Sequence, residues 1–516
     1  MKIMKKAMAM VLSMVMMLAM CATAFADEPT TFKITAPETN HQYEIYQIFT
    51  GDYSDGKLTN EVWGENGTGK KGTDVEDTVL NELKDIDANA SDTAKLEVIT
   101  KYAKLDDSTP VATVTNGSSY DAKPGYYLIK DKEGTVTGKD SYTLYLVQVV
   151  GADVTIKPKS EVPSFEKKVK DTNDSTGNTS DWQDSADYDI GDQVPFQLKG
   201  TVASNYDAYK TYYFAFHDQE EKVKVTDSEG NEKELPVLKF NKDSVKVYVD
   251  GKEVTTGFVV TENPTDGDTF DIVFEDLKAI QDTDGSALVH ANSEITVEYT
   301  SELTANANLG NQGNINKAKL EFSNNPNSNQ AGKPDKPGET PWDNVIVFTY
   351  KVVVDKYANS TDGEKLAGAD FKLEKVLADG SKQEISRKVT SDDGKTFTFS
   401  GLDEGKYILT ETKTPDGYNT IKPIEFTVKA DHTIEWNGEN RTGVLTDLTG
   451  TATTGNITFT ANTDKSELAT KVVNKQGITL PSTGGMGTTL FYMIGGILVA
   501  GAAVVLIAKK RMEAEK

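Results

Sequence analysis

The sequence has few of the residues from which exported proteins often build cross-links and metal sites. Among 516 residues there are one cysteine, Cys21, and four histidines. Cys21 lies in an N-terminal stretch, residues 1–26, that reads as a secretory signal with cleavage expected after Ala26. The mature chain would then contain no cysteine and no disulfide. The histidines are scattered without zinc spacing, so no metal and no cofactor is expected.

Positive charge is also scarce. The chain has 55 Lys and Arg residues against 80 Asp and Glu residues, which gives a formal net charge of −25. Such a chain is repelled by phosphate backbones and anionic membrane surfaces, so nucleic acid is excluded as a partner. The sequence contains no nucleophile elbow and no phosphate-binding loop. A turnover enzyme is therefore not expected.

Beyond the signal, the chain has one long apolar run, residues 490–508. The run is roughly long enough to span a bilayer core. Lys509, Lys510 and Arg511 follow it directly and mark its cytoplasmic end. It is preceded by a short motif, which consists of Leu480, Pro481, Ser482, Thr483 and Gly484. This order predicts that everything N-terminal to the run lies outside the cell.

Between the signal and the anchor, the chain divides into three expected units. Residues 27–160 mix strand patterns with a helical stretch, which predicts an α+β domain. Residues 161–335 contain many short strands with regular turn signals, as in antiparallel immunoglobulin-like sandwiches. Residues 341–476 are again strand-rich, with one long strand expected at 345–356. The segment 324–340 is rich in Asn, Pro, Gly and Lys and is expected to be a linker. The expected fold class is mainly β.

Three polar side chains of the last unit are expected on inward strand faces. Side chains two apart share a face of a strand, so Lys356 lies with Val352 and Val354. By the same rule Glu411 lies with Leu409, and Asn474 lies with Val472. Burial lowers the pKa of a lysine and raises that of a glutamate, which yields a nucleophilic amine beside a protonated carboxyl. Residue types alone favour an ion pair between Lys356 and Glu411 at a strand edge, with Asn474 as a turn residue.

The C-terminal motifs resemble those of a known family. Leu-Pro-x-Thr-Gly before an apolar helix and a basic tail (residues 480–516) is similar to the cell-wall sorting signal of Gram-positive surface proteins. A strand lysine followed by Leu-x-Gly-Ala-x-Phe-x-Leu (366–373) and Leu-x-Glu-x-x-x-Pro-x-Gly-Tyr (409–418) resembles a collagen-adhesin B-type domain with its pilin "E-box". The whole chain resembles a major (backbone) pilin of a sortase-assembled pilus.

In the last unit the resemblance implies a spontaneous isopeptide bond, formed with loss of ammonia. Lys356 would supply the amine, Asn474 the acyl group and Glu411 the catalytic carboxyl.

The second unit offers a parallel set, in which Lys167 is the expected amine, Asn324 the acyl donor and Asp218 the catalyst. Asp218 falls where related fimbrial domains carry a catalytic acid after an aromatic strand. Lys168 and Asn325 are adjacent alternatives, and strand parity is the only argument against them.

The resemblance also implies an amide between subunits. A sortase would cleave between Thr483 and Gly484 and pass the threonine carbonyl to Lys159 of a neighbouring subunit. Lys159 ends Lys157-Pro158-Lys159, whereas the family has a tyrosine at the first of these positions, so Lys157 is an alternative.

The expected function is therefore that of a structural subunit in a covalent surface pilus. The implied partners are a sortase, identical subunits, minor pilins, peptidoglycan and a host-surface ligand whose identity the sequence does not give. The alternative is a monomeric wall-anchored adhesin whose stalk is built from similar domains.

Overall fold

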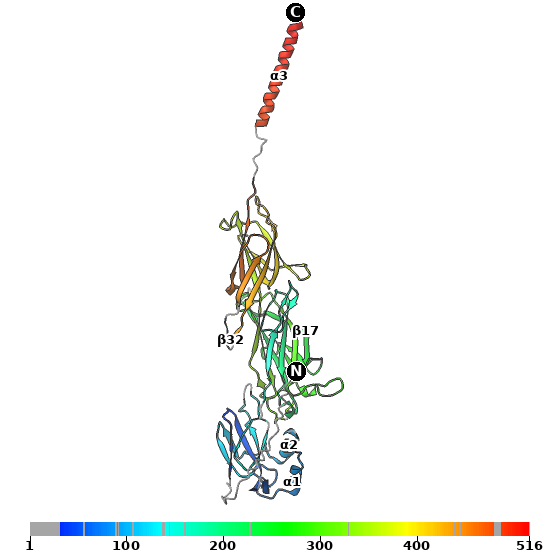
Figure 1. Ribbon diagram of the computed structural model, residues 1–516, viewed down its shortest axis with the longest axis vertical. Helices are drawn as coiled ribbons and strands as arrows, with labels where there is room; N and C mark the ends of the chain where they lie inside the picture. Colours follow the sequence, from blue (N-terminus) through cyan, green and yellow to red (C-terminus); the bar gives the residue numbers. More distant parts are fainter. Residues whose placement is uncertain are drawn as a thin grey trace, which may run out of the picture.

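The computed structural model describes residues 31–514 apart from 55–56, 88–89, 91, 106–107, 137–139, 144, 159–160, 227–228, 329, 438–439, 443–444 and 479–486. Three β-rich units follow one another along a rod, and helix α3 (Gly487–Ala514) stands beyond the third unit (Figure 1). The expected signal segment lies outside the described residues.

The first unit is an α+β domain built on the long strand β2 (Gln42–Ser54). Alternate side chains of β2 face two different cores: Tyr43 and Ile45 pack toward the small sheet, while Tyr46 and Ile48 pack toward the helices. This alternation is the ordinary geometry of a strand that is covered on both faces. The main sheet has the order β3-β2-β6-β7 with β4 also on β2, and the small sheet has the order β5-β1-β8. The remaining elements are β1 (Phe32–Thr35), β3 (Lys57–Trp63), α1 (Asp77–Lys84), α2 (Asp92–Ile99), β4 (Ala112–Thr115), β5 (Ser119–Ala122), β6 (Gly125–Asp131), β7 (Leu146–Val150) and β8 (Val154–Thr155).

The second unit is a sandwich of two sheets, as the short alternating strands predicted. One sheet has the order β12-β24-β22-β14-β20-β19, with β23 on β22, and the other has the order β18-β17-β21-β13-β9. Aromatic side chains from both sheets meet in its core, among them Phe196, Phe216, Phe270 and Tyr299. The strands are β9 (Phe165–Val169), β12 (Ser185–Asp187), β13 (Gln193–Thr201), β14 (Phe214–Glu220), β17 (Leu238–Val249), β18 (Lys252–Val254), β19 (Val259–Glu262), β20 (Phe270–Phe274), β21 (Glu294–Leu303), β22 (Asn314–Phe322), β23 (Gly338–Glu339) and β24 (Asp343–Phe348).

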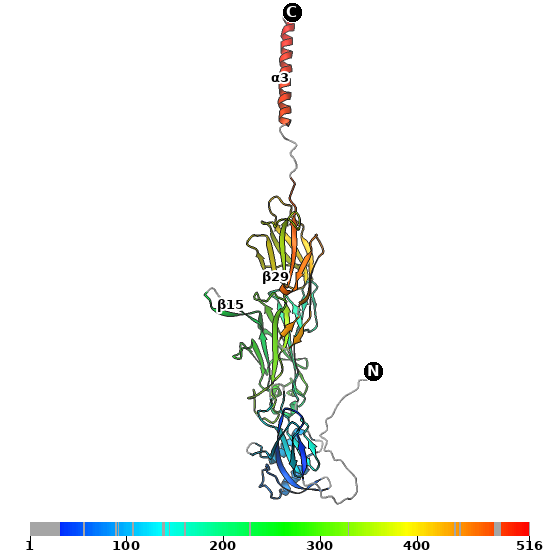
Figure 2. The same cartoon turned by 90° about the vertical axis from the view of Figure 1, so that its left-hand side faces the viewer.

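Two small ribbons extend the second unit. One joins β10 (Thr172–Asn173) to β11 (Asn178–Thr179), and the other joins β15 (Lys222–Thr226) to β16 (Glu232–Pro236). The second ribbon projects sideways from the rod (Figure 2).

The third unit is a second sandwich, in which the first and last strands lie side by side. Strands β25 and β36 pair in parallel, with Lys356 opposite Val472. One sheet has the order β28-β29-β25-β36-β35 and the other has the order β27-β26-β30-β31-β34. The strands are β25 (Tyr350–Ala358), β26 (Asp370–Val376), β27 (Lys382–Glu384), β28 (Lys388–Thr390), β29 (Thr396–Leu402), β30 (Gly405–Lys413), β31 (Ile424–His432), β32 (Glu435–Asn437), β33 (Asn440–Thr442), β34 (Leu445–Ala452), β35 (Phe459–Asn462) and β36 (Glu467–Asn474).

The junction between the second and third units differs from the sequence expectation. The single strand expected at 345–356 is two strands, because β24 pairs with β12 and β22 of the second unit and β25 begins only at Tyr350. Val345 and Val347 face the core of the second unit, whereas Ile346 and Phe348 face that of the third. Strand β24 thus contributes side chains to both cores through its two faces. Its sequence is therefore continuously apolar and does not show where the second unit ends.

The expected linker 324–340 also returns to the second unit. Strand β23 within it pairs with β22, and the Asn324 carbonyl accepts a hydrogen bond from the backbone N–H of Tyr142 at 2.6 Å. The segment therefore contacts both the first and the second unit.

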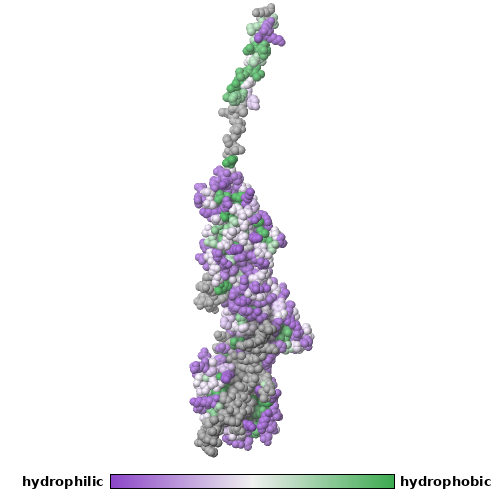
Figure 3. Space-filling view, viewed as in Figure 1, coloured by the Kyte–Doolittle hydropathy of each residue, from purple (hydrophilic) through white to green (hydrophobic). Residues whose placement is uncertain are grey.

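Helix α3 matches the expected membrane segment. Within Thr489–Ala514 an 18-residue window has a mean hydropathy of 2.5, and none of that window is buried against the rest of the chain. Figure 3 shows hydrophobic side chains along the helix and hydrophilic ones near its C-terminal end. By length and composition the helix can cross a membrane.

Candidate functional site

A buried lysine, asparagine and glutamate meet in the third unit. The Lys356 ammonium nitrogen contacts Asn474 Oδ1 and lies 3.3 Å from the Val472 carbonyl oxygen. Asn474 Nδ2 donates a hydrogen bond to Glu411 Oε1 at 2.7 Å, and the same oxygen is 3.9 Å from Lys356 Nζ. All three side chains are inaccessible or nearly so to solvent. The structure therefore brings together the three residues expected from strand parity.

The surroundings favour a reactive amine at Lys356. Burial lowers its pKa to about 8, against the opposing charge of Glu411. A lysine with that pKa has a substantial neutral fraction near neutral pH, and the neutral form is the nucleophile. Glu411 is held in place by the backbone N–H of Ile421, which donates to Oε2 at 3.1 Å. The arrangement can support attack of the amine on the Asn474 amide carbon with departure of ammonia.

A second cluster lies in the core of the second unit. Lys167 on β9 contacts Asp218 on β14 and donates a hydrogen bond to the Tyr299 hydroxyl at 2.7 Å. Tyr299 on β21 donates to Asp218 Oδ2 at 2.8 Å, and Asn316 on β22 donates from Nδ2 to the Tyr299 oxygen at 2.9 Å. Burial lowers the pKa of Lys167 and raises that of Asp218, and it raises the pKa of the neighbouring Glu220 to about 8.

The expectation that Asn324 lies at Lys167 is wrong, and Asn316 occupies that place. Asp218 pairs with Ala318 and Glu220 pairs with Asn316, so the cluster sits at the start of β22. Asn324 follows the far end of that strand, which is about 20 Å from Asn316 at a rise of about 3.3 Å per residue. Even-numbered residues of β22 do face the core, as predicted. Alternation identifies the face but cannot choose a position along it.

The alternatives next to these residues point elsewhere. Lys168 Nζ lies 2.6 Å from Asp184 Oδ1 in a partly exposed ion pair. Asn325 Oδ1 accepts from the backbone N–H of Asn327 at 3.0 Å. Neither contact belongs to the Lys167 cluster. Parity therefore selected the lysine that is buried in the core.

The residues expected to link subunits cannot be placed. Lys159 and the motif Leu480, Pro481, Ser482, Thr483 and Gly484 lie outside the described residues. The alternative lysine, Lys157, is exposed and directly follows the buried Ile156.

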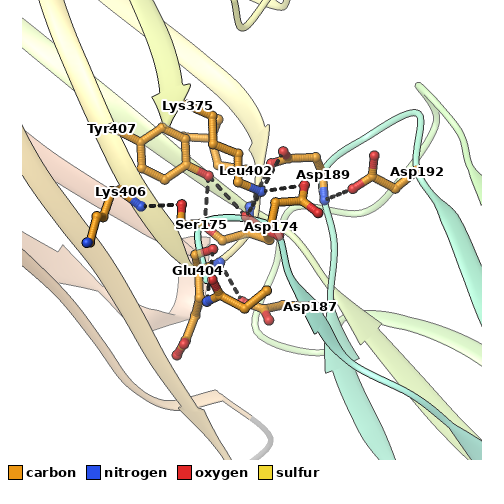
Figure 4. Close-up of polar contacts among 12 residues, drawn as sticks. Asp174, Ser175, Asp187, Asp189, Asp192, Lys375, Leu402, Glu404, Lys406 and Tyr407 are labelled. Atoms are coloured by element: carbon orange, nitrogen blue, oxygen red, sulfur yellow. Dashed lines mark hydrogen bonds and ion pairs between the residues drawn. The ribbon is translucent and has the colours of Figure 1, made fainter. Parts of the chain in front are cut away.

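A third buried lysine, which the sequence analysis missed, lies between the second and third units (Figure 4). Lys375 on β26 is 2.8 Å from Asp189 Oδ2 and 3.0 Å from Asp174 Oδ2, both of the second unit. It also contacts Asp403 of its own unit, and Tyr407 donates to that carboxylate at 3.1 Å. The signal was present, because Lys375 continues the inward row after Phe371 and Leu373.

Lys375 differs chemically from the other two buried lysines. Burial would lower its pKa, but the charges of Asp403 and Asp189 outweigh burial and raise it. The amine therefore stays cationic and does not act as a nucleophile. We interpret this cluster as a salt-bridge joint between two units.

Among the described residues, two groups of side chains have the composition of a metal site. One is formed by Asp174, Asp189, Asp192 and Asp403, and the other by His217, Asp266, Asp268 and Asp271. The Lys375 ammonium already lies among the first group. In the second group, hydrogen bonds to Asp268, Asp271 and Glu321 overcome burial and raise the pKa of His217 to about 11. Each group thus has a cation supplied by the chain itself.

Comparisons with known proteins agree with this architecture. A SpaA prealbumin-like fold domain matches residues 351–442, and an LPXTG cell wall anchor motif matches residues 472–515. The trypsin-resistant surface T6 protein of Streptococcus pyogenes is 26% identical over 68% of this chain and 70% of its own length. The fimbrial subunit type 1 of Actinomyces viscosus is 26% identical over 45% of this chain and 46% of its own length. The solved T6 backbone pilin covers 87% of this chain and 99% of its own, with a TM-score of 0.51 and 18% identity.

The chain is similar to surface and fimbrial proteins of Gram-positive bacteria. It is a wall-anchored surface protein with a mainly β fold, and its relatives are named as a surface protein and a fimbrial subunit. Its buried lysine clusters lie in the two sandwich units that form the middle and the anchor-proximal part of the rod.

Proposed function

We propose that this pilin is the shaft subunit of a covalent fibre, stabilised inside each subunit by two lysine–asparagine amide bonds. The internal bonds join Lys167 to Asn316 and Lys356 to Asn474, with Asp218 and Glu411 as their catalytic carboxyls. A sortase joins subunits from Thr483 to Lys159. Bonding of this kind is heterologous and does not close, so it produces a filament.

The observation that carries the proposal is the buried contact between Lys356 and Asn474, with Glu411 on the amide nitrogen. Burying a lysine, an asparagine and a glutamate in an apolar core would destabilise the fold if they remained unreacted polar groups. The Lys356 amine, which is the nucleophile, lies against the carbonyl of the Asn474 amide. The Glu411 carboxyl lies against the Asn474 amide nitrogen, which is the leaving group. Amide formation needs both of these pairings.

The position of the bond suits a fibre under tension. Tension enters the third unit through β25 and leaves through β36, and these strands are parallel neighbours. An amide from Lys356 to Asn474 would carry the force between them and bypass the residues in between. A closed loop of this length also stabilises by about 5 kcal/mol in the chain-entropy estimate.

The test of assembly is the Lys159→Arg variant, which keeps the positive charge but removes the amine. Wall extracts of cells with the dedicated sortase should give a high-molecular-weight ladder on denaturing gels for the natural chain. The ladder should be lost in Lys159→Arg and kept in the matched Lys157→Arg control. A single monomer band from the natural chain would contradict the proposal and favour a monomeric adhesin. Loss of the ladder in Lys157→Arg alone would move the linkage to that lysine.

A further inference from the structure

One hydroxyl connects all the reacting groups of the second unit. The Tyr299 oxygen is 2.7 Å from Lys167 Nζ, 2.9 Å from Asn316 Nδ2 and 2.8 Å from Asp218 Oδ2. Tyr299 is 2% exposed, and its ring packs against Phe196 and Phe270. These contacts hold the hydroxyl between the attacking nitrogen and the leaving nitrogen.

Other atoms of this cluster lack partners in the described structure. Asp218 Oδ1 and Asn316 Oδ1 are buried without a hydrogen bond. A buried oxygen without a partner costs about 1–3 kcal/mol, so resting protein groups normally avoid this state. A proton on Asp218 would satisfy both oxygens if the two approached each other. The cluster is thus arranged as reacting groups rather than as a finished salt bridge.

In the third unit a different group contacts the attacking and the leaving nitrogens. There Glu411 Oε1 lies 2.7 Å from Asn474 Nδ2 and 3.9 Å from Lys356 Nζ, so one carboxylate spans both nitrogens. In the second unit the described hydrogen bonds tie Asn316 Nδ2 to the lysine and the acid through Tyr299. The difference gives each chain an internal reference reaction.

We propose that Tyr299 is a catalytic residue of amide formation in the second unit and relays a proton from Lys167 Nζ to Asn316 Nδ2. The inference rests on the proposed bond between these two residues. The neutral amine attacks the Asn316 amide carbon, a carbon–Nζ bond forms and the carbon–Nδ2 bond breaks. One proton leaves Nζ for the tyrosine oxygen as the tyrosine proton passes to Nδ2. Ammonia departs, and Tyr299 is regenerated.

The test is a time course of intact mass on chains spanning residues 27–483 after cell-free synthesis. Helix α3 is not buried against the other units, so its removal leaves their described contacts in place. The natural chain should lose two ammonias, about 34 Da in total. Tyr299→Phe should lose the third-unit ammonia, about 17 Da, at the natural rate. It should lose the second-unit ammonia on the order of a hundredfold more slowly. Peptide mapping assigns each loss to its unit.

Two controls separate the relay from a structural effect. Tyr212→Phe removes another fully buried tyrosine hydroxyl from the same unit and should leave both rates unchanged. In an Asn316→Ala background, which cannot form the bond, adding Tyr299→Phe should leave the thermal midpoint within a few degrees. A large drop there would assign Tyr299 a structural role and overturn the relay.

The remaining outcomes are distinct. If Tyr299→Phe forms the second-unit bond at the natural rate, the relay is wrong while the proposed function stands. If the natural chain never loses the second-unit ammonia, the proposed bond itself fails, and the relay fails with it.

Discussion

Replacing Glu411 with glutamine should leave the third unit without its cross-link. The substitution keeps the size of the side chain but removes the carboxyl that touches Asn474 Nδ2 at 2.7 Å. Lys356 and Asn474 are 118 residues apart, so an open loop of this length forfeits about 5 kcal/mol of stability in the chain-entropy estimate. For a unit of this size that loss lowers the thermal midpoint by roughly 15–25 °C.

Calorimetry and intact mass together measure this effect. The mass of Glu411→Gln should exceed by about 17 Da the mass calculated for this variant with both internal bonds formed, because one ammonia is retained. One thermal transition should move down while the others stay in place. The control is Glu425→Gln, the same change at an exposed position on β31, which should alter neither quantity. Normal ammonia loss in Glu411→Gln, with an unshifted transition, would refute the reasoning.

Three further predictions follow from the other clusters. Asn316→Ala removes the acyl donor, so it should lose no ammonia from the second unit and leave Lys167 with a free amine. Asn324→Ala should lose that ammonia normally, and peptide mapping distinguishes the two; the reverse pattern would restore the sequence-based assignment. Lys375→Met should lower the free energy of unfolding in denaturant by about 3–5 kcal/mol, because it leaves buried carboxylates at the joint without a cationic partner. An unchanged midpoint would show that the joint is not stabilising. Burial lowers the pKa of His432 to about 4 from 6.5. Its unfolded form therefore takes up a proton first, and stability should fall by up to about 3 kcal/mol as pH drops from 6.5 to 4. His432→Gln should lose that part of the acid sensitivity, and an identical pH profile would contradict the assignment.

The His432 effect is local to the joint between the second and third units. Its ring stacks on Phe348, its Nε2 is 2.9 Å from the Tyr350 hydroxyl and its Nδ1 is 3.3 Å from Ser185 Oγ. The charge of Asp431 partly opposes the effect of burial. Protonation of the imidazole would place a charge in this packed interface, which is why acid should loosen it.

Strand alternation was enough to predict the inward faces but not positions along them. It placed Lys167, Lys356 and Glu411 in the cores, because a period of two is a local property of the backbone. It could not distinguish Asn316 from Asn324, which lie on one face of one chain segment. That choice depends on how β22 registers against β14, and register is set by the whole sheet.

Contacts between units were the other feature that could not be predicted from the sequence. The cluster at Lys375 needs Asp189 from one unit and Asp403 from another, so no pattern within a single strand reveals it. Strand β24 likewise serves two cores, and its sequence reads as one continuous apolar run. The mainly β class and the apolar C-terminal helix depend on local patterns, and both were predicted correctly.

The most direct test of covalent stabilisation is peptide mapping by mass spectrometry of the protein released from the cell wall. We expect branched peptides that join Lys167 to Asn316, Lys356 to Asn474, and Thr483 of one subunit to Lys159 of the next. Recovery of these three lysines only in linear peptides with free amines, and of both asparagines with intact amides, would contradict it.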